Sequence, residues 1–184
     1  MKKYFVLIVI LYCFSVVVVS AECIKGDCKN GIGTYAFPDG NTYEGEFKDE
    51  KMNGTGKQTF KDGRRYTGSI MDNKRHGKGI FEFPDGSKFE GEFADDKRLK
   101  GTFTWPNGDK YEGEFKGDTI TGTGVYTYSN GTRYEGELKD GKQDGKGTIY
   151  YPDGKKYVGQ FKDNKKVDQG KMIYPGGVEK EIKR

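Results

Sequence analysis

Few side chains of this 184-residue chain are of a type that could carry out a reaction. Nucleophilic catalysis needs a nucleophile activated by an adjacent base, and His76 is the one histidine. Other copies of a repeated segment carry Asn53, Thr121 or Asp144 at that position, so we expect a polar loop residue there. Paired glutamates could serve a glycosidase, but they recur in nearly every copy, which is typical of a solvated face. We therefore predict a protein that is not an enzyme.

Cofactor and metal motifs are also missing from the sequence. Neither Gly-x-Gly-x-x-Gly nor a Walker motif is present, so nucleotide binding has no support. The loop from Asp140 to Gly145 lacks the third-position ligand and the late glutamate of a calcium loop. Cys23, Cys28 and His76 are too few for a four-ligand zinc site. With 32 basic and 28 acidic residues, the chain lacks the basic excess of a nucleic-acid binder. We expect no cofactor, metal, nucleotide or nucleic acid.

The first 21 residues have the three parts of a secretory signal peptide. Lys2 and Lys3 give a positive start, and residues 4–19 are apolar apart from Ser15. Small residues then precede Glu22, which favours cleavage there. The apolar run is shorter than the roughly 20 residues that a membrane span needs. The sequence therefore predicts an exported protein, whether periplasmic, cell-surface or secreted, with a retained N-terminal membrane anchor as the alternative.

Two cysteines follow the predicted signal, in a cap segment at residues 22–30. Cys23 and Cys28 form an even pair, and an oxidising compartment favours their disulfide. Gly26 and Asp27 between them can turn the chain back on itself. A rival interpretation is a lipoprotein with Cys23 acylated, although Glu22 stands where such signals carry a small residue.

The rest of the chain is periodic. Units of the form aromatic-x-Gly-x-apolar begin at six positions, in steps of 23, 23, 22, 23 and 23 residues: Tyr43, Tyr66, Phe89, Tyr111, Tyr134 and Tyr157. A glycine stands ten residues before each aromatic, and an Asp-Gly or Asn-Gly pair ends three residues before it. Such pairs between alternating runs indicate hairpin turns with positive φ at both central residues. Each period is therefore predicted to be a β-hairpin.

Alternation along the strands assigns the residue columns to two faces. The aromatic face supplies our candidate interaction surface: Tyr43, Tyr66, Phe89, Trp105, Tyr111, Tyr128, Tyr134, Tyr151 and Tyr157. The other face carries two glutamate rows and a basic row, expected to pair with acids across the ladder: Arg65, Lys88, Lys110, Arg133 and Lys156. A mid-strand glycine such as Gly45 is expected to leave room for a large ring from the neighbouring strand.

The fifth copy, from Tyr134 to Gly147, matches nearly every fixed position of Y-x-G-x-[FW]-x-x-G-x-x-x-G-x-G. It resembles the MORN repeat (membrane occupation and recognition nexus), and the resemblance covers residues 30–175. It implies an all-β fold, an elongated twisted single-layer antiparallel sheet of tandem hairpin repeats about 23 residues long. The array of about six repeats would occupy residues 31–177, with a degenerate strand or tail at 178–184. MORN arrays are linked to membrane association, dimerisation and partner binding.

The third copy departs from the pattern. It is one residue short and has lost the first glycine of Gly-x-Gly, reading Arg98-Leu99-Lys100-Gly101. A tighter loop is expected there, with a change in twist or a bend of the array.

These features predict a non-catalytic exported module that acts as an interaction or structural scaffold through its aromatic-lined sheet. We expect a protein partner or self-association. The alternative is a peripheral phospholipid-binding module that uses the basic row and the terminal cations Lys180, Lys183 and Arg184, although flanking glutamates should weaken anionic-lipid affinity. Glycan binding, by stacking of sugars on Trp105 and the tyrosines, is the least favoured interpretation.

Overall fold

The computed structural model describes residues 21–182 of the chain. The predicted signal peptide, apart from Ala21, lies outside the described residues. Within the described range, no helix is long and apolar enough to span a membrane.

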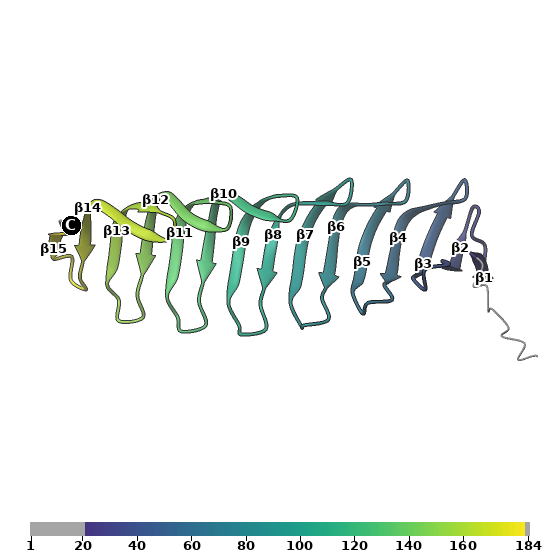
Figure 1. Ribbon diagram of the computed structural model, residues 1–184, viewed down its shortest axis with the longest axis horizontal. Coiled ribbons are helices and arrows are strands. Elements are labelled where there is room, and N and C mark those ends of the chain that lie inside the picture. The colour runs from purple at the N-terminus through teal and green to yellow at the C-terminus, as the bar shows by residue number, and fades with distance from the viewer. Residues whose placement is uncertain (1–20, 183–184) are drawn as a thin grey trace, which may run out of the picture.

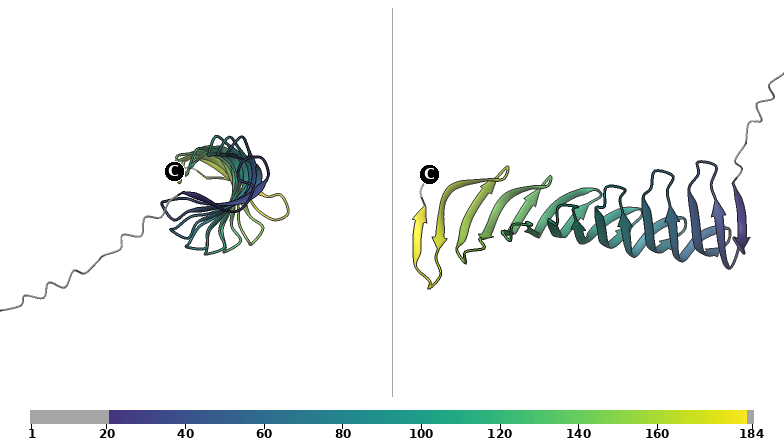
Figure 2. Two further views of the ribbon diagram at one scale, coloured as in Figure 1. Left: turned by 90° about the vertical axis from the view of Figure 1, so that its right-hand side faces the viewer. Right: turned by 90° about the horizontal axis from the view of Figure 1, so that it is seen from below.

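Within residues 21–182, fifteen strands form one antiparallel sheet, and each strand pairs with the next one in the sequence (Figure 1). The strands are β1 (Glu22–Gly26), β2 (Ile32–Ala36), β3 (Thr42–Lys48), β4 (Lys51–Thr59), β5 (Arg65–Met71), β6 (Lys74–Glu82), β7 (Lys88–Ala94), β8 (Lys97–Thr104), β9 (Lys110–Lys116), β10 (Thr119–Thr127), β11 (Arg133–Lys139), β12 (Lys142–Tyr150), β13 (Lys156–Lys162), β14 (Lys165–Ile173) and β15 (Glu179–Ile182). They lie across the long axis, and the sheet curls around that axis as it advances (Figure 2). The predicted fold class is confirmed.

The Asp-Gly turns differ from the prediction. In the β2–β3 hairpin, the Gly40 amide donates to the Phe37 carbonyl at 3.0 Å and the Phe37 amide donates to the Asn41 carbonyl at 2.9 Å. Gly40 has a φ of 89°, whereas Asp39 is not among the residues with positive φ. This is a three-residue loop, a type I turn closed by a left-handed glycine. The expectation of positive φ at both central residues was therefore wrong at these turns.

Two-residue turns with positive φ at both positions occur instead at five of the other connections, whereas between β9 and β10 Gly117 has positive φ and Asp118 does not. Asp72 and Asn73, between β5 and β6, have φ values of 49° and 69°. Asp and Asn tolerate this conformation better than other side chains, which explains their recurrence there. Each sequence period therefore contributes two hairpins, and the second kind was interpreted from sequence only as a loop.

A bulge bends most repeats near the middle of the long strands. Between the pairs Gly45–Gly56 and Phe47–Met52, residues 53–55 of β4 lie opposite Glu46 alone. A side chain on Gly45 would come within 2.6 Å of the Gly56 Cα and would also collide with the Tyr43 hydroxyl. The glycine thus makes room for the ring of its own strand as well as for the partner backbone, whereas we predicted a ring from the neighbouring strand.

The short third repeat loses its residue from this bulge and not from its loop. Its turn keeps positive φ at Asp95 and Asp96, at 47° and 69°. Only Leu99 and Lys100 lie opposite Glu92, and β8 has eight residues where other long strands have nine. The expected tighter loop was therefore wrong, because a smaller bulge absorbs the deletion.

The core lies along one face of the sheet and is mainly aromatic. Its largest buried members are the repeat aromatics and the apolar residue four positions after each of them. Rings meet edge to face within a repeat, as in Tyr43–Phe47 at 5.1 Å, and between repeats, as in Phe89–Phe115 at 5.1 Å. A single-layer sheet can therefore bury rings fully because every repeat covers its neighbour.

Candidate interaction surface

The structure removes six residues from the predicted interaction surface. Each is at most 2 % exposed and belongs to the core: Tyr43, Tyr66, Phe89, Tyr111, Tyr134 and Tyr157. A partner cannot reach these rings, and the prediction is corrected for them. The sequence pattern assigned the correct face but gave no sign of how deeply each column would be covered. Trp105, Tyr128 and Tyr151 remain partly exposed.

The buried tyrosines have a structural role at the bulges. The hydroxyl of Tyr43 donates to the carbonyl of Glu46 at 2.9 Å, and Tyr66 makes the same bond to Ser69 at 2.7 Å. Burial raises the pKa of both phenols to about 12. The short repeat has Phe89 at this position, so the missing hydroxyl coincides with the smaller bulge.

The accessible aromatic surface runs along residues that precede the three-residue turns. Seven rings form a continuous chain of contacts, which we call the aromatic ridge: Phe60, Phe81, Phe83, Phe103, Trp105, Tyr126 and Tyr128. Successive centroids along it are 5.9, 4.9, 5.7, 4.7, 5.2 and 4.5 Å apart. All of these rings except Phe81 are partly exposed. A row of partly exposed rings is a candidate interaction site, because contiguous apolar patches on a surface often mark such sites.

Hydrogen-bonding groups accumulate toward the C-terminal end of the ridge. Trp105 brings an indole N–H, and Tyr126 and Tyr128 bring hydroxyl groups. The Gln143 amide donates to the Tyr128 oxygen at 3.3 Å, which leaves the hydroxyl proton of Tyr128 available to an acceptor. The N-terminal end of the ridge consists of phenylalanines alone.

An arginine pocket adjoins the phenylalanine end of the ridge. It has a volume of about 250 Å³ and is lined by Arg64, Arg75, Phe81, Phe83, Phe93, Asp96, Arg98 and Asp118. Its wall therefore holds three guanidinium groups and two carboxylates.

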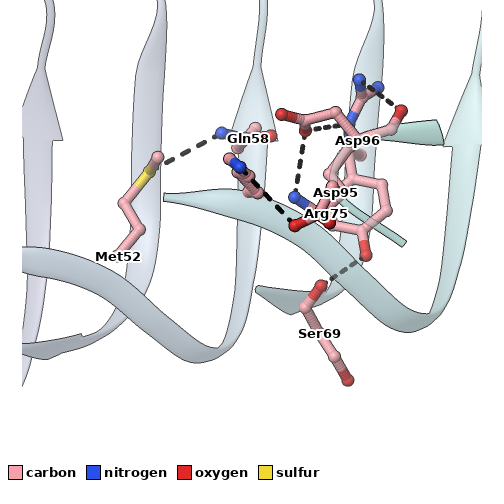
Figure 3. A network of polar contacts seen from close by, with 8 residues as sticks. Met52, Gln58, Ser69, Arg75, Asp95 and Asp96 are labelled. Atoms are coloured by element: carbon pink, nitrogen blue, oxygen red, sulfur yellow. Dashed lines mark hydrogen bonds and ion pairs between the residues drawn. The ribbon is translucent and has the colours of Figure 1, made fainter. Parts of the chain in front are cut away.

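Each inner guanidinium of the pocket is held by one aspartate and several rings. Arg75 donates through Nε to Asp96 Oδ1 at 2.9 Å (Figure 3) and lies 5.0 Å from the Phe81 ring. Arg98 donates through Nη2 to Asp118 Oδ1 at 2.6 Å and lies over three rings. The aspartates fix the arginine side chains, and the rings shield them from water.

Sequence reasoning missed these arginines. They occupy a column nine residues after each repeat aromatic, which reads Met52, Arg75, Arg98, Ile120, Gln143 and Lys166. In this column, which lies on the apolar face, only the second and third repeats have an arginine. That exception in the sequence could have indicated the pocket.

The opposite face carries a groove of about 660 Å³, lined by glutamates, lysines, threonines and bare glycine backbone. Two members of the predicted basic row pair with glutamates along the same strand, Lys88 with Glu90 at 3.1 Å and Arg133 with Glu135 at 3.0 Å. We had expected pairing across the ladder. Glu46 accepts the Thr55 amide at 2.8 Å, so this glutamate is bound to the bulge and is more than a solvated side chain.

Two further predicted positions can be placed. His76 lies within strand β6 and not in a loop, and its buried Nδ1 has no partner within residues 21–182. Cys23 and Cys28 are joined by a disulfide with their Cα atoms 5.9 Å apart, at the N-terminal edge of the sheet. Over the same range, no group of three or more His, Cys, Asp or Glu residues could hold a metal ion.

Comparison with known proteins relates the chain to one family and one fold. The family model described as MORN repeat matches residues 26–42, 43–64, 66–88, 100–110, 111–133, 134–156 and 157–178. No curated protein matches the chain. The TCP domain of SAS-4 (dCPAP) from Drosophila melanogaster, solved with a proline-rich motif of Ana2 (dSTIL), is 12% identical. It aligns with a TM-score of 0.59 over 100% of this chain and 99% of that one.

A second solved structure is more distant. It is the TCP10 domain of Danio rerio CPAP in complex with a STIL peptide, 18% identical, with a TM-score of 0.36 over 84% of this chain and 80% of that one. At 12% identity, the likeness to the Drosophila domain is one of fold alone.

Proposed function

This chain belongs to the MORN-repeat family, and we propose that it is a non-catalytic exported scaffold that binds an extended segment of a partner protein along its aromatic ridge. The observation that carries the proposal is the unbroken chain of ring contacts from Phe60 to Tyr128, whose members other than the buried Phe81 stay partly exposed. Rings in the core column are covered by neighbouring repeats, whereas those of the ridge have one side open. Aromatic anchors of this kind dominate the binding energy of protein interfaces.

Two further observations support the proposal. The Drosophila TCP domain, which shares the fold, was solved in complex with a proline-rich motif of another protein. Export is supported by the signal-like N-terminal sequence and by the disulfide, because oxidising compartments favour such bonds. Anionic lipid has less support, because Lys88 and Arg133 of the basic row are already paired with glutamates.

A peptide selection tests this function. Random peptides displayed on phage are selected against the purified protein, and the enriched peptides are measured against two double variants. Trp105→Ala with Tyr128→Ala removes two ridge rings, whereas Thr102→Ala with Glu112→Gln alters the groove of the opposite face. We expect the ridge variant to weaken binding by at least about tenfold and the control variant to bind as the native protein does.

Two results would overturn the proposal. One is the absence of enriched peptides, and the other is equal binding by both variants. If the protein instead binds vesicles of anionic phospholipid at low salt and releases them at high salt, peripheral membrane binding replaces peptide binding as the function.

A further inference from the structure

The spacing of the ridge rings points to the backbone conformation of the bound segment. Phe60, Phe83, Trp105 and Tyr128 each follow an even-numbered strand directly, so neighbouring members of this set are two strands apart. Strands in a sheet lie about 4.8 Å apart, which gives an interval of about 9.6 Å between equivalent rings. A polyproline II helix has three residues per turn and rises about 3.1 Å per residue, or about 9.3 Å per turn. Every third residue of such a helix would therefore meet a ring.

Other backbone conformations fit this interval less well. A β-strand presents the same face every two residues, or about every 6.7 Å, which does not match the interval of about 9.6 Å between the rings. An α-helix returns to one face after seven residues, about 10.5 Å, and so drifts by about 1 Å per repeat. A polyproline II segment has no internal hydrogen bonds, so it can also follow the curl of the array (Figure 2) without breaking any.

The donors of the ridge match the needs of such a segment. The carbonyl groups of a polyproline II helix have no partner within the helix and must be satisfied from outside. Trp105 and Tyr128 carry an N–H and a hydroxyl on the C-terminal half of the ridge, whereas the Tyr126 hydroxyl already interacts with Asp109. Grooves lined by aromatic residues with such donors are the usual receptors of this conformation.

The arginine pocket adds a set of charged hydrogen-bond donors at the other end of the ridge. Arg75 and Arg98 use Nε and Nη2 for their aspartates, and no partner of Nη1 is found for either within the described chain. Arg64 uses Nε for Asp62 at 2.7 Å. Each of the three guanidiniums is thus paired with one aspartate, but each pair leaves some guanidinium N–H donors unused. A carboxylate beside shielded guanidiniums makes charge-assisted hydrogen bonds that are stronger than they would be in open water.

We propose that the partner segment is a polyproline II helix running along the long axis of the array. Every third position of this helix is an apolar residue or proline that contacts one of four ridge rings, and an acidic side chain lies in the arginine pocket. The four rings are Phe60, Phe83, Trp105 and Tyr128. This inference rests on the proposed function and names the chemistry of its partner.

Defined peptides test the inference by fluorescence anisotropy with the full mature protein. The probe has about twelve residues, with proline at every third position and one glutamate, placed at either end in two versions to cover both chain directions. One control peptide replaces the glutamate by glutamine. A second replaces the prolines by glycine, and a third moves them to every second position.

Two protein variants test whether the acidic side chain of the peptide binds in the arginine pocket. Arg64→Gln removes a guanidinium that is 44% exposed. Among the described residues this group has one ion pair, with Asp62, and one ring contact, with Phe60 at 5.0 Å, so the fold should be kept. Arg133→Gln is the matched control, because this arginine is similarly exposed at 39% but lies on the opposite face. We expect the glutamine peptide and the Arg64 variant each to weaken binding about tenfold, and the Arg133 variant to change nothing.

The possible outcomes distinguish failure of this inference from failure of the proposed scaffold function. The inference is overturned if the glycine or shifted-proline peptides bind as well as the probe, or if Arg64→Gln has no effect. It also fails if the selected peptides depend on the ridge but lack an apolar residue at every third position, or lack an acidic residue. In that case the proposed scaffold function is still supported. If no peptide binds the ridge at all, both fail together.

Discussion

The phenolic hydroxyl of Tyr134 donates a 2.8 Å hydrogen bond to the backbone carbonyl of Glu137, three residues later on the same strand. Glu137 sits where the β11–β12 register shifts, so its carbonyl faces the bulge. The tyrosine therefore provides a donor for a carbonyl at a point where the ladder is interrupted. The same bond occurs in three other repeats, which makes the tyrosine of the repeat unit a partner of its bulge.

Replacing Tyr134 by Phe should lower the free energy of unfolding by about 1 kcal/mol, because the Glu137 carbonyl loses its phenolic donor while the ring stays in place. Chemical denaturation measures the change. Tyr35→Phe is the control, since the Tyr35 ring is half-buried and no described residue bonds its hydroxyl. Equal effects of the two substitutions would contradict the assigned role.

Replacing Gly131 by Val should cost more than about 1 kcal/mol of stability, because a β-branched residue resists positive φ. Gly131 has a φ of 83° and closes the turn with a 2.9 Å bond to the Tyr128 carbonyl. Gly131→Asn should cost much less, since asparagine tolerates the left-handed region. A Val variant that melts like the native protein would refute the turn geometry.

Stability should fall at alkaline pH. Burial raises the pKa of Tyr43, Tyr66, Tyr111 and Tyr134 to about 12, whereas these phenols ionise near 10 in the unfolded chain. The folded chain holds their protons more tightly, so this stabilisation is complete below pH 10 and is lost as the pH rises toward 12. Phenolate absorbance should show these tyrosines titrating together with unfolding. Titration of every tyrosine near 10 in a folded protein would contradict the prediction.

The exported protein should contain no free thiol, since Cys23 and Cys28 are joined. The loop closed by the disulfide is short, so the entropy model gives at most about 2–3 kcal/mol. Cys28→Ser should raise amide exchange in the β2–β3 hairpin and leave β11 unchanged, because repeats contact only their neighbours. Thiol labelling of the denatured, non-reduced protein tests whether a free thiol is present. Two reactive thiols would disprove the pairing, and one would indicate an acylated Cys23 or a linked dimer.

The mature chain should begin at Glu22 without a fatty acid, because Val19 and Ala21 are the small residues that a signal peptidase requires. Intact mass of the protein from its native envelope or medium measures this. A mass that includes residues 1–21 would support the retained anchor, and an acylated Cys23 would make the protein a lipoprotein.

Periodicity was enough to predict the strand order, the face of each column and the position of the turns. Turn type was less accessible, because Asp39-Gly40 suits both a two-residue turn and the three-residue loop that Pro38 favours. Burial could not be predicted either. Tyr134 and Tyr128 are both aromatic and lie on the same face, yet only the register of the neighbouring repeats decides that the first is covered and the second is partly open.

The arginine pocket escaped prediction for a related reason. Arg75 and Arg98 are charged residues in an apolar column, and sequence alone does not bring Asp96 and Asp118 to them from the turns of the following repeats. Such contacts depend on how the bent hairpins stack, which the alternation of polar and apolar residues does not encode.

Because the strands lie across the long axis (Figure 1), the ladder hydrogen bonds run nearly parallel to that axis. Tension applied to the two ends of the array would thus peel one strand from the next, loading the bonds of a ladder one after another and not all at once. Sheets whose strands lie along the pulling direction resist by shearing many bonds together. The array should therefore unfold at a lower pulling force than such sheets do, one repeat after another.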